Sequence, residues 1–261
     1  IGNGTSLIIF VGIVASLWAG IFHTLDSVMT GALAWWAGLG LFALIGAIIV
    51  VIVYFERAQR RLLVQYPKRQ QGNRVFGGES SHLPLKLNTA GVIPPIFASS
   101  LLLMPMTIAN FNAQGAPGWL TDTVALLGHG KPLYMILYGA LIIFFCFFYT
   151  AIVFNPKETA ENLKKYNGFL PGIRPGQKTA EYIDYVLTRL TVVGAIYITA
   201  VCLIPEFIVA QYGANLLAMG GTSILILVTV TMDTVAQVHS HMLAHQYESL
   251  IKKAKFKGAR R

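Results

Sequence analysis

The chain has 261 residues, of which 55% are hydrophobic and only 12% are charged, and it carries a formal net charge of +9. An average soluble domain is about 25% charged. This composition excludes an ordinary water-soluble protein, because several apolar runs reach the roughly 20 residues of helix that cross a bilayer.

Six transmembrane segments are predicted in chain order, at 5–22, 32–55, 88–111, 132–154, 190–210 and 216–238. The second and fourth are the clearest, with the runs "LFALIGAIIVVIVYF" and "MILYGALIIFFCFFYTAIVF". We therefore expect an all-α integral membrane protein. Cys146 and Cys202 lie inside apolar runs and form neither a CxxC motif nor a disulfide framework, so we expect both to behave as small buried hydrophobes.

These segments divide the chain into eight regions: the first span with its loop (1–31), the second span (32–55), a long polar loop (56–87), the third span with its loop (88–131), the fourth span (132–154), a second long polar loop (155–189), the fifth and sixth spans (190–238) and a basic tail (239–261). The chain opens at Ile1 with neither a methionine nor a basic segment. We therefore expect residues 1–22 not to be a signal peptide, and the chain to be a processed, split or truncated product.

The loop 56–87 contains the stretch "VQYPKRQQGNRVFGGESSHLPLK", which is basic and rich in glycine. Gly72, Gly77 and Gly78 favour tight turns with positive φ. A connection of this length far exceeds the 2–8 residues usual between bundle helices, and long loops tend to be functional. From the residues alone, a tether between membrane spans and a surface that a partner grasps both remain open.

The third span, "NTAGVIPPIFASSLLLMPM", is the weakest of the six. It carries an asparagine, two serines and three prolines: Asn88, Ser99, Ser100, Pro94, Pro95 and Pro105. Such residues are tolerated at membrane depth only where protein or a water-filled cavity surrounds them. From the residues alone, a proline-kinked helix buried in a bundle and a helix that lines a cavity remain equally open.

The loop 155–189 contains "PGIRPGQKT", in which two Pro-Gly steps bracket Arg174. Proline fixes φ and glycine permits sharp reversals, so we expect Arg174 to be displayed at a stiff tip. A solvated arginine and one that inserts into a partner both remain open on this pattern alone.

Lysine and arginine are distributed unevenly between the two sides of the predicted membrane. Nineteen of the twenty lie in 56–87, 155–189 and 239–261, whereas the connections on the other side hold only Lys131. Positively charged loops stay on the cytoplasmic side. We therefore expect the N-terminus, the two long loops and the tail to be cytoplasmic, on a basic face that attracts anionic lipid, RNA or an acidic protein patch.

Motifs for catalysis are absent from the sequence, which lacks GxxxxGK[ST], GxGxxG, HExxH and GxSxG. Asp233 lies near the end of the sixth span, where an interfacial carboxylate is favoured over a proton relay. His239, His241 and His245 do not share one helix face, and no carboxylate or cysteine completes a ligand set. We expect no enzymatic activity, no cofactor and no metal site.

Several stretches together resemble the bacterial SecY family, the central subunit of the protein-translocating channel: "GNGTSLIIF", "ERAQRRLLVQYPKRQQG", "HLPLKLNTAGVIPPIFASS", "FFCFFYTAIVFNPKETAENLKK", "PGIRPGQKTAEYID", "LIPEF" and "GGTSILI". The resemblance covers essentially the whole chain and implies spans five to ten of a ten-span, inverted-repeat protein. That is the C-terminal half plus one span, without the first four spans and the plug. We therefore do not expect this chain alone to close a pore.

The resemblance also implies roles for individual residues. Ile9, Ile96 and Ile226 match a ring of aliphatic side chains that seals the pore around a translocating polypeptide, akin to a dewetting gate. Thr5, one turn before Ile9, is also assigned to the constriction, but it stands where close relatives have isoleucine, so the ring is expected to be less tight at that point. Without the resemblance, these isoleucines would be read as helix packing.

The third span is similar to the family's lateral-gate helix, which faces both the pore and the lipid exit. The residues expected to form the gate are Asn88, Ile93, Pro94, Ser99 and Ser100. The two long loops are similar to those that dock the ribosome or the motor ATPase SecA. The residues expected to dock are Arg60, Arg61, Lys68, Arg69, Arg74, Arg174 and Lys178.

Two docking positions match the family individually. Arg74 matches one of an adjacent basic pair, whose other member is replaced by Asn73. Arg174 matches the loop-tip arginine on which motor-driven translocation depends. The replacement at Asn73 is expected to weaken contact with the phosphates of ribosomal RNA.

The resemblance implies a passive channel in the bacterial inner membrane that moves unfolded secretory chains and releases membrane spans sideways. The partners it implies are SecE, SecG, SecA, the ribosome, the nascent or precursor polypeptide, SecDF, YidC, anionic lipid and the N-terminal part of SecY. A secondary transporter is the alternative, but it predicts paired ionisable residues deep in the spans, and Asp233 alone does not supply them. A membrane enzyme predicts a catalytic cluster that the sequence lacks.

Overall fold

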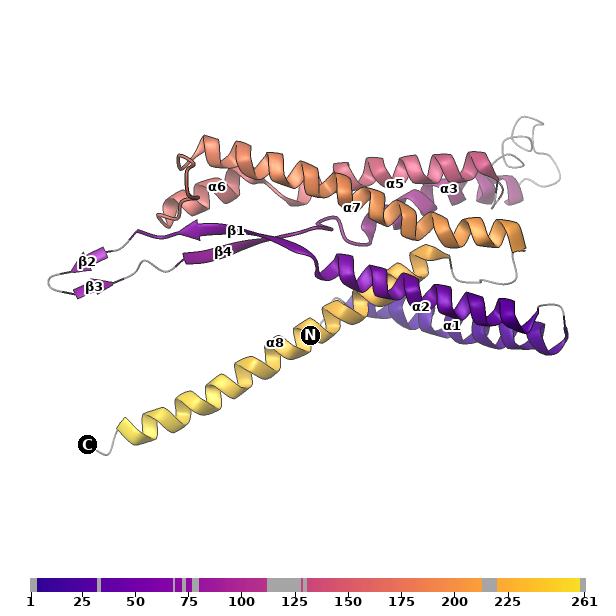
Figure 1. Ribbon diagram of the computed structural model, residues 1–261, viewed down its shortest axis with the longest axis horizontal. Helices are drawn as coiled ribbons and strands as arrows, with labels where there is room; N and C mark the ends of the chain where they lie inside the picture. Colours follow the sequence, from indigo (N-terminus) through magenta and orange to yellow (C-terminus); the bar gives the residue numbers. More distant parts are fainter. Residues whose placement is uncertain are drawn as a thin grey trace.

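The computed structural model describes residues 4–31, 34–67, 69–71, 74–76, 80–111, 128, 131–212 and 220–258. Its helices are α1 (Gly4–Met29), α2 (Trp35–Arg57), α3 (Ile93–Phe111), α5 (Pro132–Val153), α6 (Pro156–Lys165), α7 (Gln177–Tyr212) and α8 (Gly221–Gly258). Its strands are β1 (Gln59–Gln65), β2 (Arg69–Gln71), β3 (Arg74–Phe76) and β4 (Ser80–Lys86). Long helices form the body, and the strands extend from one end of it (Figure 1).

Within the described residues, five helices are long and apolar enough to cross a membrane: α1, α2, α5, α7 and α8. Large aliphatic side chains point outward from them; Ile8 is 76% exposed and Ile136 is 71% exposed. A water-soluble protein would bury such side chains, so these faces are built to contact lipid or other membrane helices. The chain is a multi-pass membrane protein, as its composition predicts.

Helix α3 is the shortest of the predicted spans. It runs over 19 residues, whereas each of the other five has 22 or more. Pro105 lies inside the helix, and Pro94 and Pro95 in its first turn are fully buried. Proline is tolerated in a first turn because the backbone N–H there lacks an intrahelical partner in any case. The prolines of this weak segment are therefore compatible with a helix, though a short one.

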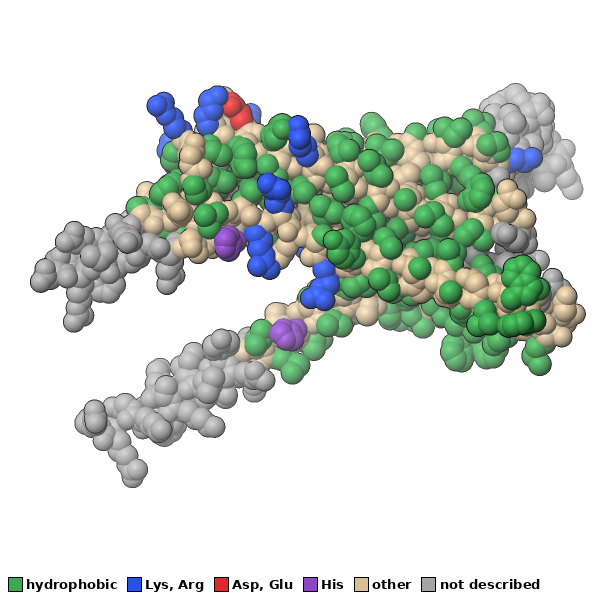
Figure 2. All heavy atoms as spheres, viewed as in Figure 1, with side chains coloured by type: hydrophobic (Ala, Val, Ile, Leu, Met, Phe, Trp, Pro, Cys, Tyr) green, Lys and Arg blue, Asp and Glu red, His purple; other side chains and the backbone are tan. Residues whose placement is uncertain are grey.

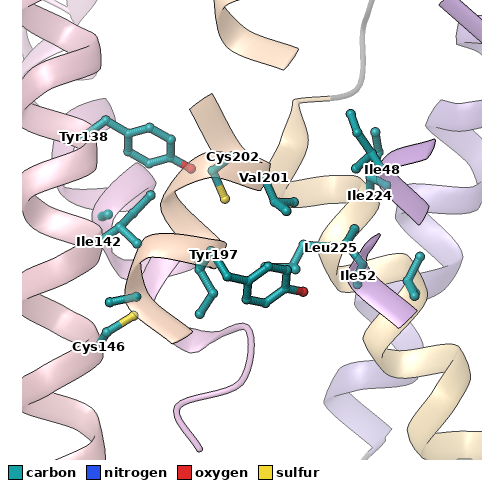
Figure 3. Packing of buried hydrophobic residues seen from close by; sticks show 14 of the residues in the cluster. Ile48, Ile52, Tyr138, Ile142, Cys146, Tyr197, Val201, Cys202, Ile224 and Leu225 are labelled. Atoms are coloured by element: carbon teal, nitrogen blue, oxygen red, sulfur yellow. The ribbon is translucent and has the colours of Figure 1, made fainter. Parts of the chain in front are cut away.

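The helices pack as two groups. Helix α5 packs against α3 and α7, while α8 packs against α1 and α2 (Figure 1). Contacts of α7 with α8 and α2 join the two groups. The main hydrophobic core lies at this junction, where Ile142 and Cys146 of α5, Tyr197 of α7 and Leu225 of α8 are all buried (Figure 3). Both cysteines of the chain are buried and unpaired, as expected.

A glycine lets the two groups approach each other closely. Gly221 begins α8 against the backbone of α7. A Cβ atom added at Gly221 would collide with the carbonyl oxygen of Val201 and would lie 2.8 Å from the Cα of Cys202. Only glycine permits this contact, in the way that small residues let membrane helices approach each other closely.

The loop 56–87, for which the sequence analysis predicted turns, contains an antiparallel ladder. Strands β1 and β4 pair along their whole length, from Gln59 opposite Lys86 to Gln65 opposite Ser80. Beyond them, β2 and β3 form a second short antiparallel pair. We call the β1–β4 ladder the ribbon. Gly72, Gly77 and Gly78, at the predicted turns, lie outside the described residues.

The ribbon has its own small hydrophobic core. Leu62 of β1 and Leu85 of β4 are buried against Leu170, Ile183 and Val186. Side chains alternate between the two faces of a strand, so one face of the ribbon packs on the second loop and on the start of α7 while the other is exposed. The two loops predicted as separate docking elements therefore fold together.

Two helices extend beyond the predicted spans. Helix α7 begins at Gln177, whereas the fifth span was predicted from residue 190; its first turns pack under the ribbon. Helix α8 continues to Gly258, so the predicted basic tail is helical through most of its length. Hydropathy finds only the apolar part of a helix, and a continuous helix need not end where the membrane does.

Candidate functional site

The end of the molecule that carries the ribbon forms one platform. We use this name for the ribbon, α6, the first turns of α7 and the turn at 170–176, which we call the arginine turn. A β-bridge joins the two loops: the Gln65 N–H donates to the Phe169 carbonyl at 2.9 Å, and the Phe169 N–H donates to the Gln65 carbonyl at 3.0 Å. Gly168 packs so closely that an added Cβ would lie 3.1 Å from both Val64 and Tyr66.

The arginine turn has a tight backbone geometry at its Pro-Gly step. The Ile173 N–H donates to the Leu170 carbonyl at 3.1 Å across Pro171 and Gly172, and Gly172 has φ of +81°. This is the arrangement of a type II turn, with proline and glycine at its two central positions. Leu170 is buried in the ribbon core, so the turn is fixed to the platform.

Arg174 lies at the exposed tip of this turn. Its carbonyl accepts a hydrogen bond at 3.0 Å from the Oγ1 of Thr179, a side chain that is only 2% exposed. Gly176, with φ of +109°, then leads the chain into α7. The buried hydroxyl of Thr179 thus fixes the backbone of Arg174, while the side chain of Arg174 is exposed to solvent.

The other predicted docking residues are distributed over the platform. Arg60 and Arg61 are exposed near the start of β1. Lys178 is exposed in the first turn of α7 and forms an ion pair with Glu181 at 3.2 Å. The backbone of Arg69 and Arg74 is described in β2 and β3, but their side chains are not, and Lys68 and Asn73 lie outside the described residues. Figure 2 shows blue side chains gathered over α6, α7 and the ribbon.

Asn88 connects the platform to α3. It is 6% exposed, and its Nδ2 donates to the Glu56 Oε1 at 2.6 Å, near the end of α2. Its Oδ1 accepts from the Gly91 N–H at 3.0 Å, and Gly91 adopts a positive φ of +66°. One side chain therefore ties the start of α3 to the end of α2 and shapes the turn between β4 and α3.

Helix α7 packs against the same segment between β4 and α3. A Cβ added at Gly194 would lie 2.8 Å from the carbonyl oxygen of Leu87, immediately before Asn88. Neither Glu56 nor Gly194 was predicted as a site residue. Their partners are many residues away in the chain, so no local pattern marks them. The base of the ribbon, the end of α2 and the middle of α7 therefore all contact the segment that leads into α3.

The remaining predicted gate residues lie in the first half of α3. Pro94 is buried, and Ile93 is half-buried. The hydroxyls of Ser99 and Ser100 both donate to the carbonyl of Ile96, at 2.9 Å and 2.8 Å. Such back-bonding satisfies a hydroxyl inside a membrane and often bends a helix. Among the residues that the structure describes, the serines are thus accommodated without a partner from another helix.

The predicted constriction residues lie on three helices. Ile9 of α1 is 40% exposed, Ile96 of α3 is half-buried, and Ile226 of α8 is 7% exposed. Because α1 packs on α8 while α3 packs on α5, Ile9 and Ile226 lie on neighbouring helices and Ile96 lies in the other group. For Thr5, the structure describes only the backbone in α1. A ring that includes Ile96 therefore remains a prediction.

Relatives of this chain are translocase subunits. The chain is 55% identical over 262 residues to the protein translocase subunit SecY of Vibrio cholerae, covering 99% of this chain and 59% of that protein. It is 55% identical over 259 residues to the Escherichia coli K12 subunit, with 99% and 58% coverage. It is 53% identical over 257 residues to that of Rickettsia bellii, with 98% and 59% coverage. The chain thus spans about three-fifths of the length of these relatives.

Solved structures share the fold. "The structure of a protein conducting channel" is similar with a TM-score of 0.63 at 18% identity, covering 94% of this chain and 60% of the other. A SecY structure described by its plug domain is similar with a TM-score of 0.58. At that identity the likeness shows fold alone. The SecY family profile matches residues 1–235, and the chain therefore belongs to the SecY family.

Proposed function

We propose that this chain forms part of a protein-conducting channel that passes unfolded secretory polypeptides across the bacterial inner membrane and releases membrane segments sideways into lipid. The observation that carries this proposal is the identity of 53–55% to SecY translocase subunits over nearly the whole chain. A secondary transporter is not favoured, because the spans lack the paired ionisable groups that such transporters use.

The platform would face the cytoplasm, where basic loops stay. There it would dock the ribosome and the SecA motor through Arg174, Lys178 and the basic residues of the β2–β3 pair, including Arg69 and Arg74. The fixed backbone at Arg174 supports this role, because a turn that is already ordered avoids the cost of ordering a loop on binding. The motor or the ribosome would supply the energy, and the channel would be passive.

The gate would be α3. Its first turn is attached to the platform through Asn88, so a partner that pulls on the ribbon would act on the start of this helix. The constriction would be formed by Ile9, Ile96 and Ile226, with Thr5 beside them. The rest of the pore would come from the N-terminal part of SecY, and SecE and SecG would complete the complex, with SecDF and YidC as further partners.

A chimera tests this proposal. This chain would replace the corresponding region of the Escherichia coli subunit, to which it is 55% identical. We expect the chimera to restore growth and the export of a secretory precursor when the native subunit is depleted, whereas cells without it accumulate the precursor. A chimera that reaches the membrane in normal amounts but exports nothing would contradict the proposal.

A further inference from the structure

Glu56 is a half-buried carboxylate at the end of α2. Lys86 of β4 and Asp233 of α8 act on its charge with opposite signs, and both of these side chains are exposed. Within the described residues, the side chain that hydrogen-bonds to Glu56 is Asn88, at 2.6 Å. A carboxylate at the end of a membrane helix requires such a donor, because an unpaired charge there is strongly destabilising.

Asn88 would keep hydrogen bonds of its own if it separated from Glu56. Its Oδ1 accepts from the Gly91 N–H at 3.0 Å, and its Nδ2 also donates to the Gly91 carbonyl at 3.2 Å. Both of these bonds lie within the turn between β4 and α3, so they would move together with Asn88. The bond to Glu56, by contrast, joins this turn to another helix.

A second donor for Glu56 lies on α7. Tyr197 is 5% exposed, and no described residue pairs with its buried hydroxyl. Its ring is nearly parallel to that of Phe55, with the two centroids 4.5 Å apart. Figure 3 shows the Tyr197 ring extending from α7 toward Ile52, which lies one turn before Glu56 on α2. Glu56 is also close enough to act on Tyr197 electrostatically.

The two donors differ in what they lose without the carboxylate. Asn88 keeps its bonds to Gly91, whereas the hydroxyl of Tyr197 has no described partner. A buried hydroxyl without a partner is destabilising, and a hydrogen bond from it to a carboxylate would remove that cost. An exchange of Asn88 for Tyr197 would therefore leave Glu56 paired and would satisfy a group that is unpaired in the present arrangement.

We propose that Glu56 is the centre of a latch with two positions. In the first, which the structure shows, Glu56 accepts from Asn88 and holds the start of α3 against α2. In the second, Glu56 accepts from the hydroxyl of Tyr197, and the start of α3 is released. Tyr197 is then a positioning residue for the opening of the gate; this last step rests on the proposed function of α3, whereas the exchange of partners does not.

A distance between α2 and α3 tests the latch without any translocation. Spin labels would be attached to cysteines that replace Tyr54 of α2 and Leu101 of α3, both exposed, in the purified full chain in lipid nanodiscs. The two native cysteines are buried and should not be labelled. We expect one distance in the otherwise unaltered chain and a second, longer one in Asn88→Asp. The introduced carboxylate repels Glu56 but still accepts from the Gly91 N–H. A single, unchanged distance in Asn88→Asp would overturn the proposal.

Tyr197→Phe distinguishes an exchange of partners from a general loosening of the helices. Added to Asn88→Asp, it removes the second donor and is expected to lower the ratio of the longer to the shorter distance about tenfold, the effect of one hydrogen bond to a charged group. Tyr185→Phe removes an exposed hydroxyl from the same helix and should leave the ratio unchanged. Asn155→Asp adds a negative charge at the N-cap of α6, where aspartate also caps, and should give one distance. Equal ratios with Tyr197→Phe and Tyr185→Phe, or a second distance in Asn155→Asp, would contradict the latch.

Export by the chimera tests the consequence for the gate. A gate that is held less firmly needs less binding energy to open. We therefore expect Asn88→Asp to export more of a precursor whose leading apolar segment has been shortened, and Tyr197→Phe to export the normal precursor more slowly. Unchanged export by both variants would overturn the role of the latch in the gate. If the unaltered chimera exports nothing, the proposed function fails, while the distances still decide whether the latch exists.

Discussion

Motor-driven export is expected to stop in the Arg174→Glu variant of the chimera, while assembly and membrane insertion remain normal. Arg174 lies on a turn whose backbone is fixed by Thr179 and by the positive φ of Gly172 and Gly176. The substitution changes only an exposed side chain, so the fold should not respond. Arginine anchors in binding interfaces contribute about 2 kcal/mol or more, which corresponds to about thirtyfold in affinity.

Lys165→Glu is the matched control for that prediction. It makes the same change of charge on an exposed residue at the end of α6, on the same platform. Import of a precursor into inverted vesicles, driven by SecA, would be compared for both variants. Similar losses in the two would show that only the total charge of the platform matters. Normal import by Arg174→Glu would refute a docking role for this arginine.

Gly221→Ala is expected to destabilise the packing of α8 on α7. The added Cβ would meet backbone atoms of Val201 and Cys202, which cannot rotate away as a side chain could. Overpacking of a filled core costs about 1–3 kcal/mol, and a clash with backbone belongs at the upper end of this range or above it. The thermal midpoint of the purified chain in detergent should fall accordingly.

The preceding residue provides the control. A Cβ at Gly220 would meet nothing within 4 Å, so Gly220→Ala should leave the midpoint nearly unchanged. The two variants add the same methyl group one residue apart, and only the one at Gly221 meets the backbone of α7. Equal midpoints would show that α7 and α8 do not approach as closely as the structure has them.

The membrane helices could be predicted from the sequence because lipid imposes a simple rule on composition. A run of about 20 apolar residues is enough to predict a transmembrane helix. Among the described residues, five of the six predicted spans are helices long and apolar enough to cross a membrane. The first turns of α7 and the end of α8 could not be predicted in the same way, because their polar residues carry no such signal.

The ribbon was missed although a signal exists. Leu62 and Val64 alternate with exposed residues in β1, and Leu83 and Leu85 alternate in β4. Alternation over so few residues is weak evidence for a strand, and Pro84 argues against one in the middle of a sheet. A two-stranded ladder tolerates this proline, since both of its strands are edges.

The turn around Arg174 was predictable because proline and glycine encode it locally. The junction at Asn88 was not, because its partner Glu56 lies 32 residues earlier in the chain and Gly194 belongs to another helix. Residues that specify a fold over long distances look ordinary in a single sequence. The structure alone shows that the ribbon, α2 and α7 all meet at the start of α3.

The central claim is that a polypeptide crosses the membrane beside this chain, and photocrosslinking of an arrested precursor in the chimera tests it most directly. Photoreactive residues would replace Ile9, Ile96 and Ile226 in turn, with Ile8 and Ile136, whose side chains are the more exposed, as controls. The account predicts adducts between the precursor and the first three positions, and none at the controls. Adducts of equal yield at Ile8 and Ile136, or no adducts at Ile9, Ile96 and Ile226, would contradict it.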